Sequence, residues 1–299
     1  MILRQPLYLL RFSARKIRNF LTQKEFFFSK TVNHSSSGVF LLKPINNHMI
    51  NTLLSAEASS TALELLTGSG LASYTAFTFF VGTMAMMAAC VFFFFEMRNV
   101  NEQWRTSMLV SGLITFIAAV HYYYMRGFYM DYQESPTFFR YVDWLLTVPL
   151  MCVEFYLITK KAGAKIGLLW KLILASVIML VTGYFGEAVD RGNSIMWGVL
   201  SGAAYFYIAY LVWFGEVAQL AANAGPAVAK ATKTLAWFVL VGWAIYPLGY
   251  IIGTPGGLFG AFGSDMNNPM MDVVYNIGDA VNKIGFGLVI YALTQSSKD

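Results

Sequence analysis

Seven apolar stretches, each about as long as a membrane-crossing helix, constrain the fold of this chain more than any other feature. A helix rises about 1.5 Å per residue, so about 20 apolar residues cross the roughly 30 Å of hydrocarbon in a bilayer. The sequence therefore predicts an all-α membrane protein, a bundle of seven transmembrane helices. The stretches are Leu71–Met97, Thr106–Met125, Phe138–Thr159, Ile166–Phe185, Ser194–Phe214, Thr232–Ile252 and Val273–Thr294.

Composition and charge exclude several other classes. The chain is 57% hydrophobic and 12% charged, which is too apolar for an ordinary soluble domain. Its formal net charge of +5 comes from residues 1–50, which hold eight Lys or Arg against one Glu, so nucleic-acid binding is not indicated. Cys90 and Cys152 lie in apolar stretches, typical of small buried hydrophobes. No cluster of ligands predicts a metal site.

The chain is expected to have four parts. Residues 1–60 are basic, and they are typical of either an organelle-targeting leader or a disordered or surface-lying segment. Residues 61–70 are expected to form a linker, residues 71–295 the seven-helix domain, and residues 296–299 a short tail.

Charges in the predicted loops orient the bundle. One set of loops is basic, and the opposite set is acidic. Positively charged loops stay on the cytoplasmic side, so the C-terminus is expected in the cytoplasm or an equivalent compartment. The basic set holds Arg98, Arg105, Lys160, Lys161, Lys165, Lys230 and Lys233, and the acidic set Asp131, Glu134, Glu187, Asp190, Asp265 and Asp272.

The seventh stretch carries an ionisable pair, Asp279 and Lys283, well inside its ends. Four residues apart on a helix, the two side chains share one face. A charged side chain at membrane depth costs at least about 2.5–3.5 kcal/mol, so such a residue is a functional candidate. Two interpretations stay open at this point. The pair either fixes helix packing, or the lysine amine forms a Schiff base with an aldehyde and Asp279 is part of its counterion.

The third stretch carries three ionisable residues, Arg140, Asp143 and Glu154. At about 100° per residue they share one face with Thr147 and Met151, and that face cannot point at lipid. Asp143 and Glu154 lie roughly 16 Å apart along the axis, too far to touch. We interpret them as two stations of a proton path, one on either side of a central site. Two independent buried acids are the alternative.

Motifs in three stretches carry a resemblance to a known family. They are Asp279-x-x-x-Lys283 in the seventh stretch, Trp243-Ala-Ile-Tyr246-Pro247-Leu-Gly-Tyr250 in the sixth and Arg140-Tyr-Val-Asp143-Trp144-Leu-Leu-Thr147-Val-Pro-Leu in the third. Together they resemble the microbial rhodopsins, and among these the light-driven proton pumps of the proteorhodopsin and xanthorhodopsin type. The resemblance covers about residues 70–295 and leaves out the first sixty.

The resemblance implies a role for each matching polar residue. Lys283 would carry all-trans retinal as a protonated Schiff base in the centre of the bundle. Asp143 would be its main counterion and the proton acceptor, and Asp279 the second counterion. A buried cation of this kind needs a nearby anion to stay protonated. Glu154 would re-protonate the Schiff base, Arg140 would lead to the exit route, and Thr147 would hydrogen-bond near Asp143.

The resemblance also implies the walls of a retinal pocket and three further sites. Trp144, Trp243, Tyr246 and Tyr250 would enclose the polyene, with Pro247 shaping the pocket. His121 would pair with the acceptor aspartate, with a hydrogen-bond donor in helix packing as the alternative. Met151, at the colour-tuning position, implies green absorption. Gly198 would leave an opening that admits a carotenoid antenna, although a small residue for close helix contact is an equal alternative.

The residues at positions 143, 147 and 154 form the Asp-Thr-Glu pattern of proton pumps. The expected function is a light-driven outward proton pump, an ion transporter and not an enzyme. The alternative is a sensory photoreceptor of the same fold that signals through a partner, and a seven-helix transporter without retinal is a remote third. The expected partners are membrane lipids, the transported proton and further copies in a pentamer or hexamer. The basic leader favours a eukaryotic organelle or endomembrane, with the plasma membrane as the alternative.

Overall fold

The structure is a computed structural model that describes residues 71–253 and 269–296. The chain divides into two units, Met1–Ser55 and Ala56–Asp299, and every described residue belongs to the second. The predicted leader at residues 1–60, the linker at 61–70 and residues 297–299 of the tail therefore lie outside the described residues.

The described residues form long helices joined by short connections. The bounds of the elements in chain order are α3 Leu71–Glu96, α4 Glu102–Tyr132, α5 Thr137–Thr159, η1 Lys160–Ala162, α6 Ile166–Tyr184, η2 Phe185–Val189, η3 Arg191–Asn193, α7 Ser194–Trp213, α8 Glu216–Asn223, α9 Pro226–Trp237, η4 Phe238–Gly242, α10 Ile245–Gly253 and α11 Pro269–Ser296.

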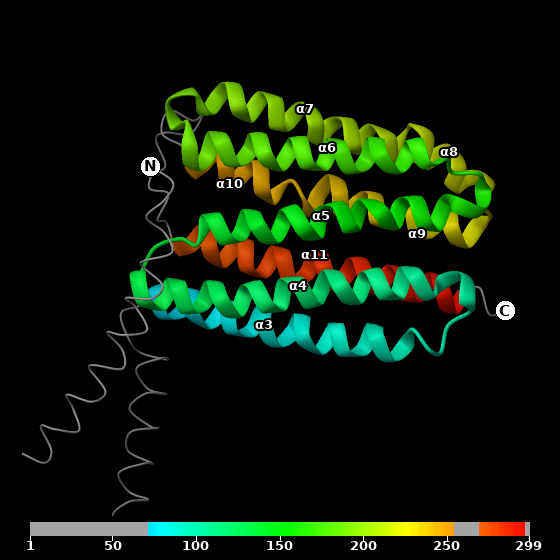
Figure 1. Cartoon of the computed structure of the whole chain (residues 1–299), viewed down its shortest axis with the longest axis horizontal. Coiled ribbons are helices and arrows are strands. Elements are labelled where there is room, and N and C mark those ends of the chain that lie inside the picture. Colours follow the sequence, from blue (N-terminus) through cyan, green and yellow to red (C-terminus); the bar gives the residue numbers. More distant parts are fainter. Residues whose placement is uncertain (1–70, 254–268, 297–299) are drawn as a thin grey trace, which may run out of the picture. The chain divides into compact units, whose positions relative to one another are not determined.

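Seven of these helical segments are long and apolar enough to cross a membrane, which confirms the predicted seven-helix bundle. Helices α3 to α7 pack each against the next, and α11 lies against α3 and α4 as well as α9 and α10 (Figure 1). Large apolar side chains such as Trp170 and Phe206 face outward, where lipid can solvate them. The protein is therefore an integral, multi-pass membrane protein.

The second span is longer than the sequence predicted. The prediction ended at Met125, whereas α4 continues to Tyr132. Arg126, a good helix former, lies within this extension, and its guanidinium is 5.9 Å from the centre of the Phe80 ring. The helix ends at Gln133, whose left-handed backbone (φ 55°) lets its N–H donate to the carbonyl of Tyr129.

The sixth span starts earlier than predicted and is not one continuous helix. It begins at Pro226, at the first helical position after Gly225 with φ 102°. In η4 each backbone hydrogen bond joins residues five apart, as in a π-helix. A turn at Trp243–Ala244 then precedes α10. Pro247 has no N–H to donate and its ring clashes with the carbonyl four residues before, so the regular helix breaks here.

The bundle has two chemically different ends. The basic end, on the right in Figure 1, contains the connections with Arg98, Lys160, Lys165 and Lys230. The opposite, acidic end contains the connections with Glu134 and Asp190. Hydrogen bonds from Trp197 and Asn193 lower the pKa of Asp190, so this carboxylate stays charged at neutral pH.

Candidate functional site

Lys283 lies near the middle of α11 and meets two carboxylates from different helices. Its Nζ lies 2.6 Å from Asp143 Oδ2 on α5 and 2.6 Å from Asp279 Oδ2, one turn earlier on α11. All three side chains are buried, with at most 2% of each exposed. A lysine held between two acids at membrane depth is costly as packing alone, and it is suited to chemistry in which a positive charge must stay buried.

Asp279 connects this ion cluster to an aromatic wall. Its Oδ1 accepts hydrogen bonds from Trp144 Nε1 at 3.2 Å and from the Tyr246 hydroxyl at 2.8 Å. The rings of Trp144 and Tyr246 meet edge to face, with centroids 4.6 Å apart. Both rings therefore bind the carboxylate through their polar atoms and present their apolar faces to the space beside it.

That space is a cavity of about 960 Å³ between α5, α6, α7 and the broken sixth span. Its volume lies at the upper end of the range of small-molecule pockets, and its lining is largely apolar and aromatic. Six of the predicted cofactor-binding residues line it, namely Trp144, Gly198, Trp243, Tyr246, Pro247 and Tyr250. The break in the sixth span thus lies in the cavity wall.

Asp143 has one oxygen that is free of hydrogen bonds. Within the part of the chain that the structure describes, its Oδ1 has no hydrogen-bond partner. His121 Nδ1 lies 4.0 Å from that oxygen, beyond hydrogen-bond distance, and its own hydrogen bond is to the carbonyl of Ile117 at 2.8 Å. His121 and Asp143 thus lie close together without a hydrogen bond between them. The hydroxyl of Thr147 donates to the backbone carbonyl of Asp143 at 2.9 Å.

Arg140 lies toward the acidic end and pairs with a carboxylate outside the ion cluster. Its Nη2 donates to Asp272 Oδ1 at 2.7 Å and its Nη1 to Asn276 Oδ1 at 3.2 Å. The guanidinium is buried and lies 5.0 Å from the centre of the Tyr275 ring. Asp272 also accepts from the Ser135 hydroxyl at 2.8 Å. Arg140 and Asp272 thus form a second buried ion pair, which lies between the ion cluster and the acidic end.

Glu187 and Tyr141 are joined by a hydrogen bond near the acidic end of the bundle. The Tyr141 hydroxyl donates to Glu187 Oε2 at 2.6 Å. Glu187 belongs to the π-helical turn η2 at the end of the fourth span rather than to a loop. Such turns are common at functional sites because they redirect side chains.

Glu154 lies alone toward the basic end of α5. Its side chain is fully buried, and Oε1 accepts from the Ser111 hydroxyl at 3.4 Å. Oε2 has no hydrogen-bond partner among the residues described. As predicted from their spacing, Glu154 and Asp143 do not touch, and Lys283 contacts Asp143. The structure therefore separates two acid sites on one helix.

The structure differs from the predicted site at Met151 and adds contacts that the sequence did not predict. Met151 is buried in the core but does not line the cavity. The partners of Arg140, namely Asp272 and Asn276, were not predicted as site residues. Asp272 lies seven residues before Asp279, on the same helical face, and this spacing is a signal that could have indicated it. Ser111, across the helix interface from Glu154, had no such signal because it lies on another span.

Comparisons with known proteins agree with this geometry. The model of the bacteriorhodopsin-like protein family matches residues 73–297. The green-light absorbing proteorhodopsin of Gamma-proteobacterium EBAC31A08 is 45% identical over 229 residues, which cover 75% of this chain and 88% of that protein. The blue-light absorbing proteorhodopsin of Gamma-proteobacterium Hot 75m4 is 44% identical over 223 residues, covering 74% and 86%.

Solved structures give the same result. The crystal structure of a blue light-absorbing proteorhodopsin from Med12 superposes with a TM-score of 0.63 at 41% identity, covering 75% of this chain and 99% of that one. The structure of xanthorhodopsin, described as a light-driven ion pump with dual chromophore, superposes with a TM-score of 0.67 at 28% identity, covering 77% and 95%.

Proposed function

This chain belongs to the bacteriorhodopsin-like protein family, and from that premise we propose that it is a light-driven outward proton pump with all-trans retinal bound to Lys283. One observation carries the proposal. The Lys283 amine lies 2.6 Å from a carboxylate on its own helix and 2.6 Å from one on α5, and the first of these carboxylates is bonded to two rings that line a large aromatic cavity. A charge held in this way can lose its proton to one partner while the other keeps the site balanced.

The residues around Lys283 fit retinal. The apolar cavity begins at Trp144 and Tyr246, which are bonded to the same Asp279 that pairs with the lysine. Trp243 and Pro247 lie in the same wall and would hold the polyene. When bound, retinal supplies the absorption of light and a change of shape that redirects the proton at the lysine nitrogen.

Asp143 is suited to take up that proton. Its Oδ2 contacts the lysine nitrogen, and its Oδ1 has no hydrogen-bond partner in the described part of the chain. Asp279 is less suited, because Trp144 and Tyr246 already donate to it and stabilise its charge. We therefore assign proton acceptance to Asp143 and a permanent counter-charge to Asp279.

Glu154 is suited to return a proton from the basic end. An ionised carboxylate in an apolar site with one long hydrogen bond is costly, so Glu154 holds its proton until the lysine nitrogen needs one. A proton that enters at Glu154 and leaves past Asp143 and Arg140 moves from the basic end to the acidic end. If the basic end faces the cytoplasm, this direction is outward.

The test is the light-driven pH change of a suspension of cells that express the full chain with all-trans retinal. We expect the medium to acidify in light and a protonophore to abolish the change. Asp143→Asn should remove it, whereas Asp190→Asn, which changes an acid outside the ion cluster, should keep it. Lys283→Ala should be colourless.

Each contrary outcome has a clear meaning. A coloured protein without any pH change would contradict pumping and support a sensory photoreceptor of the same fold. A colourless unmodified protein would contradict retinal binding itself. Alkalinisation of the medium would contradict the outward direction.

The finer proposal of a carotenoid antenna rests on Gly198. This glycine lines the cavity together with Ile195 and Val199, which are exposed on the outer face of α7. A side chain at Gly198 would meet Tyr250 Cε1 at 2.8 Å, so the glycine also serves close packing, the alternative reading. An excitation band of an added hydroxylated carotenoid that sensitises retinal, lost in Gly198→Trp, supports the antenna. No such band in the unmodified protein contradicts it.

The oligomeric state and the membrane are further proposals. We propose a pentamer or hexamer, for which the exposed apolar outer surface supplies contact area shared with membrane lipids. We also propose an organelle or endomembrane on the basic residues 1–60 alone, although the proteorhodopsins named above come from bacteria, which lends it no support. Native mass spectrometry and imaging of a fluorescent fusion would test the two proposals.

A further inference from the structure

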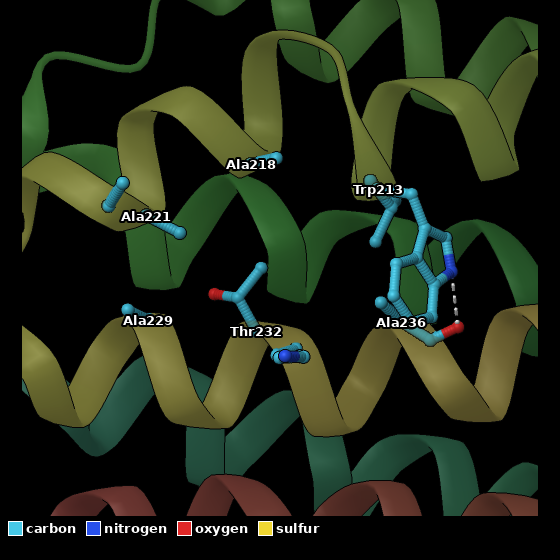
Figure 2. A pocket seen from close by; sticks show the side chains of 9 residues that line it. Trp213, Ala218, Ala221, Ala229, Thr232 and Ala236 are labelled. Carbon is cyan, nitrogen blue, oxygen red and sulfur yellow. Dashed lines mark hydrogen bonds between the residues drawn. The ribbon is translucent and has the colours of Figure 1, made fainter.

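A second, smaller pocket lies at the basic end of the bundle, and its lining includes none of the ion-cluster residues Asp143, Asp279 and Lys283. It has a volume of about 320 Å³ and lies between the end of α7, the short helix α8 and the stretch of α9 from Ala229 to Ala236. Five of its nine lining residues are alanines, and Val212 and Trp213 add further apolar surface. The Trp213 indole N–H is occupied by the carbonyl of Ala236 at 3.1 Å, so it offers the pocket an apolar face (Figure 2).

One buried hydroxyl in this pocket has no partner. Thr232 is 3% exposed, and its Oγ1 makes no hydrogen bond within the described residues. Other buried threonines, such as Thr83 and Thr115, donate to the carbonyl four residues before them. The Thr232 hydroxyl instead projects from α9 toward α8 (Figure 2). A buried hydroxyl left in this way costs about 1–3 kcal/mol, which indicates a ligand atom that accepts its proton.

The pocket is poorly suited to water. A buried water molecule needs two to four polar partners, whereas the side chains of this pocket offer one hydroxyl and the exposed Lys233. A flexible apolar chain would fill the space between the alanine methyl groups. The ligand that fits therefore has an apolar chain, a hydrogen-bond acceptor for the Thr232 hydroxyl beside that chain, and a negative charge for the Lys233 ammonium group.

The position along α9 suits a lipid. Thr232 lies six residues after Pro226, so it is roughly 9 Å along the axis from the start of the span, near the border of head-group and hydrocarbon regions. Lys233 follows it, and among the described residues no acidic side chain forms an ion pair with Lys233. Basic pockets between helices on this side of a membrane bind anionic head groups.

We propose that this pocket binds one anionic phospholipid of the leaflet at the basic end. One acyl chain lies along Val212, Trp213 and Ala236, which are the deeper part of the lining, an ester carbonyl accepts the hydrogen bond of Thr232, and the phosphate pairs with Lys233. The site does not depend on retinal or on proton transport.

The experiment is native mass spectrometry of the purified full chain, titrated with phosphatidylglycerol or phosphatidylcholine of the same acyl chains. We expect one phosphatidylglycerol to bind with a Kd about five-fold lower than that of phosphatidylcholine. Thr232→Val should weaken both lipids by about three- to ten-fold, because both carry the ester carbonyl. Lys233→Gln should weaken phosphatidylglycerol by about five-fold and phosphatidylcholine by less, because choline offsets the phosphate charge of the second lipid.

Matched variants separate this site from general surface attraction. Lys230 is exposed one turn earlier on α9 and does not line the pocket, so Lys230→Gln should change neither Kd. Thr234, whose hydroxyl donates to the carbonyl of Lys230, gives the same control as Thr234→Val. Ala222→Leu should fill the pocket from its exposed side and weaken both lipids, with folding of every variant checked by circular dichroism.

Three outcomes would overturn the proposal. Equal Kd values for the two lipids would contradict a preference for a head group with net negative charge. An effect of Lys230→Gln as large as that of Lys233→Gln would reduce the binding to unspecific electrostatics. Displacement of phosphatidylglycerol by an equal concentration of oleate would assign the pocket to a free fatty acid.

Discussion

At the scale of single residues, the buried ionisable side chains differ in the number and charge of the groups that contact them. Lys283 has two carboxylates, Arg140 has one carboxylate and one amide, and Glu154 has serine hydroxyls. Because a charge without partners is costly inside a membrane, these contacts predict which groups stay charged and which hold a proton.

The Arg140–Asp272 pair gives a prediction about stability. Arg140→Gln leaves Asp272 buried without its main partner, and Asp272→Asn leaves the guanidinium in the same state, so each should lower the free energy of unfolding by about 3–5 kcal/mol. The double variant should be more stable than the sum of the two effects, with a coupling of about 0.5–3 kcal/mol. Thermal unfolding in detergent, followed by circular dichroism, measures all three. Additive effects would mean that the two groups do not act as a pair.

Glu154 gives a prediction about kinetics. Glu154→Gln keeps the shape of the side chain but removes the exchangeable acid, so the late return of a proton to the lysine nitrogen should slow about 100-fold or more. Flash spectroscopy of the coloured protein measures this step, and Ser176→Ala, another buried polar change on α6, serves as the control. A small weak acid added to the buffer should restore the rate in the Gln variant. An unchanged rate would show that the proton enters elsewhere.

At the scale of the helices, close packing depends on glycines that meet aromatic rings. A methyl group at Gly287 of α11 would overlap the ring of Phe93, which is fully buried on α3. Small residues allow helices to approach closely in a membrane, where no hydrophobic effect drives them together. The contact between α11 and α3 helps to position the helix that carries Lys283.

Gly287→Ala should therefore destabilise the bundle by about 1–3 kcal/mol, because the Phe93 ring has no space to move. Gly127→Ala is a matched control, since a methyl group there meets nothing within 4 Å, and alanine favours the helix by up to about 1 kcal/mol. Thermal unfolding of the two variants gives the comparison. Similar midpoints for both would contradict the packing argument.

At the scale of the whole molecule, the family match and the ion clusters all lie between residues 73 and 297. The division of the chain falls at Ser55, well before the first span. From these two observations we expect the bundle to fold without residues 1–55.

A chain that starts at residue 56 should therefore keep the visible absorption band of the full chain. Its thermal midpoint should differ by less than about 2–4 °C, which corresponds to roughly 1 kcal/mol for a domain of this size. Absorption spectra and thermal scans of the two purified chains make the comparison. A colourless or aggregated short chain would show that the leader takes part in folding.

The sequence by itself determined the class, the number of spans and the identity of most charged groups. Apolar length and in-span charge are local properties, because each span must satisfy the membrane by its own composition. Hence Lys283, Asp143, Asp279 and Glu154 could be named before any coordinates.

Only the tertiary structure decided what each charge touches. Arg140 pairs with Asp272, His121 donates to its own helix, and the sixth span breaks at the cavity. Such facts depend on which faces of separate helices meet and on how far a π turn rotates a side chain. The physical reason is that periodicity within one helix gives the direction of a residue, whereas its partner is set by the packing of another helix.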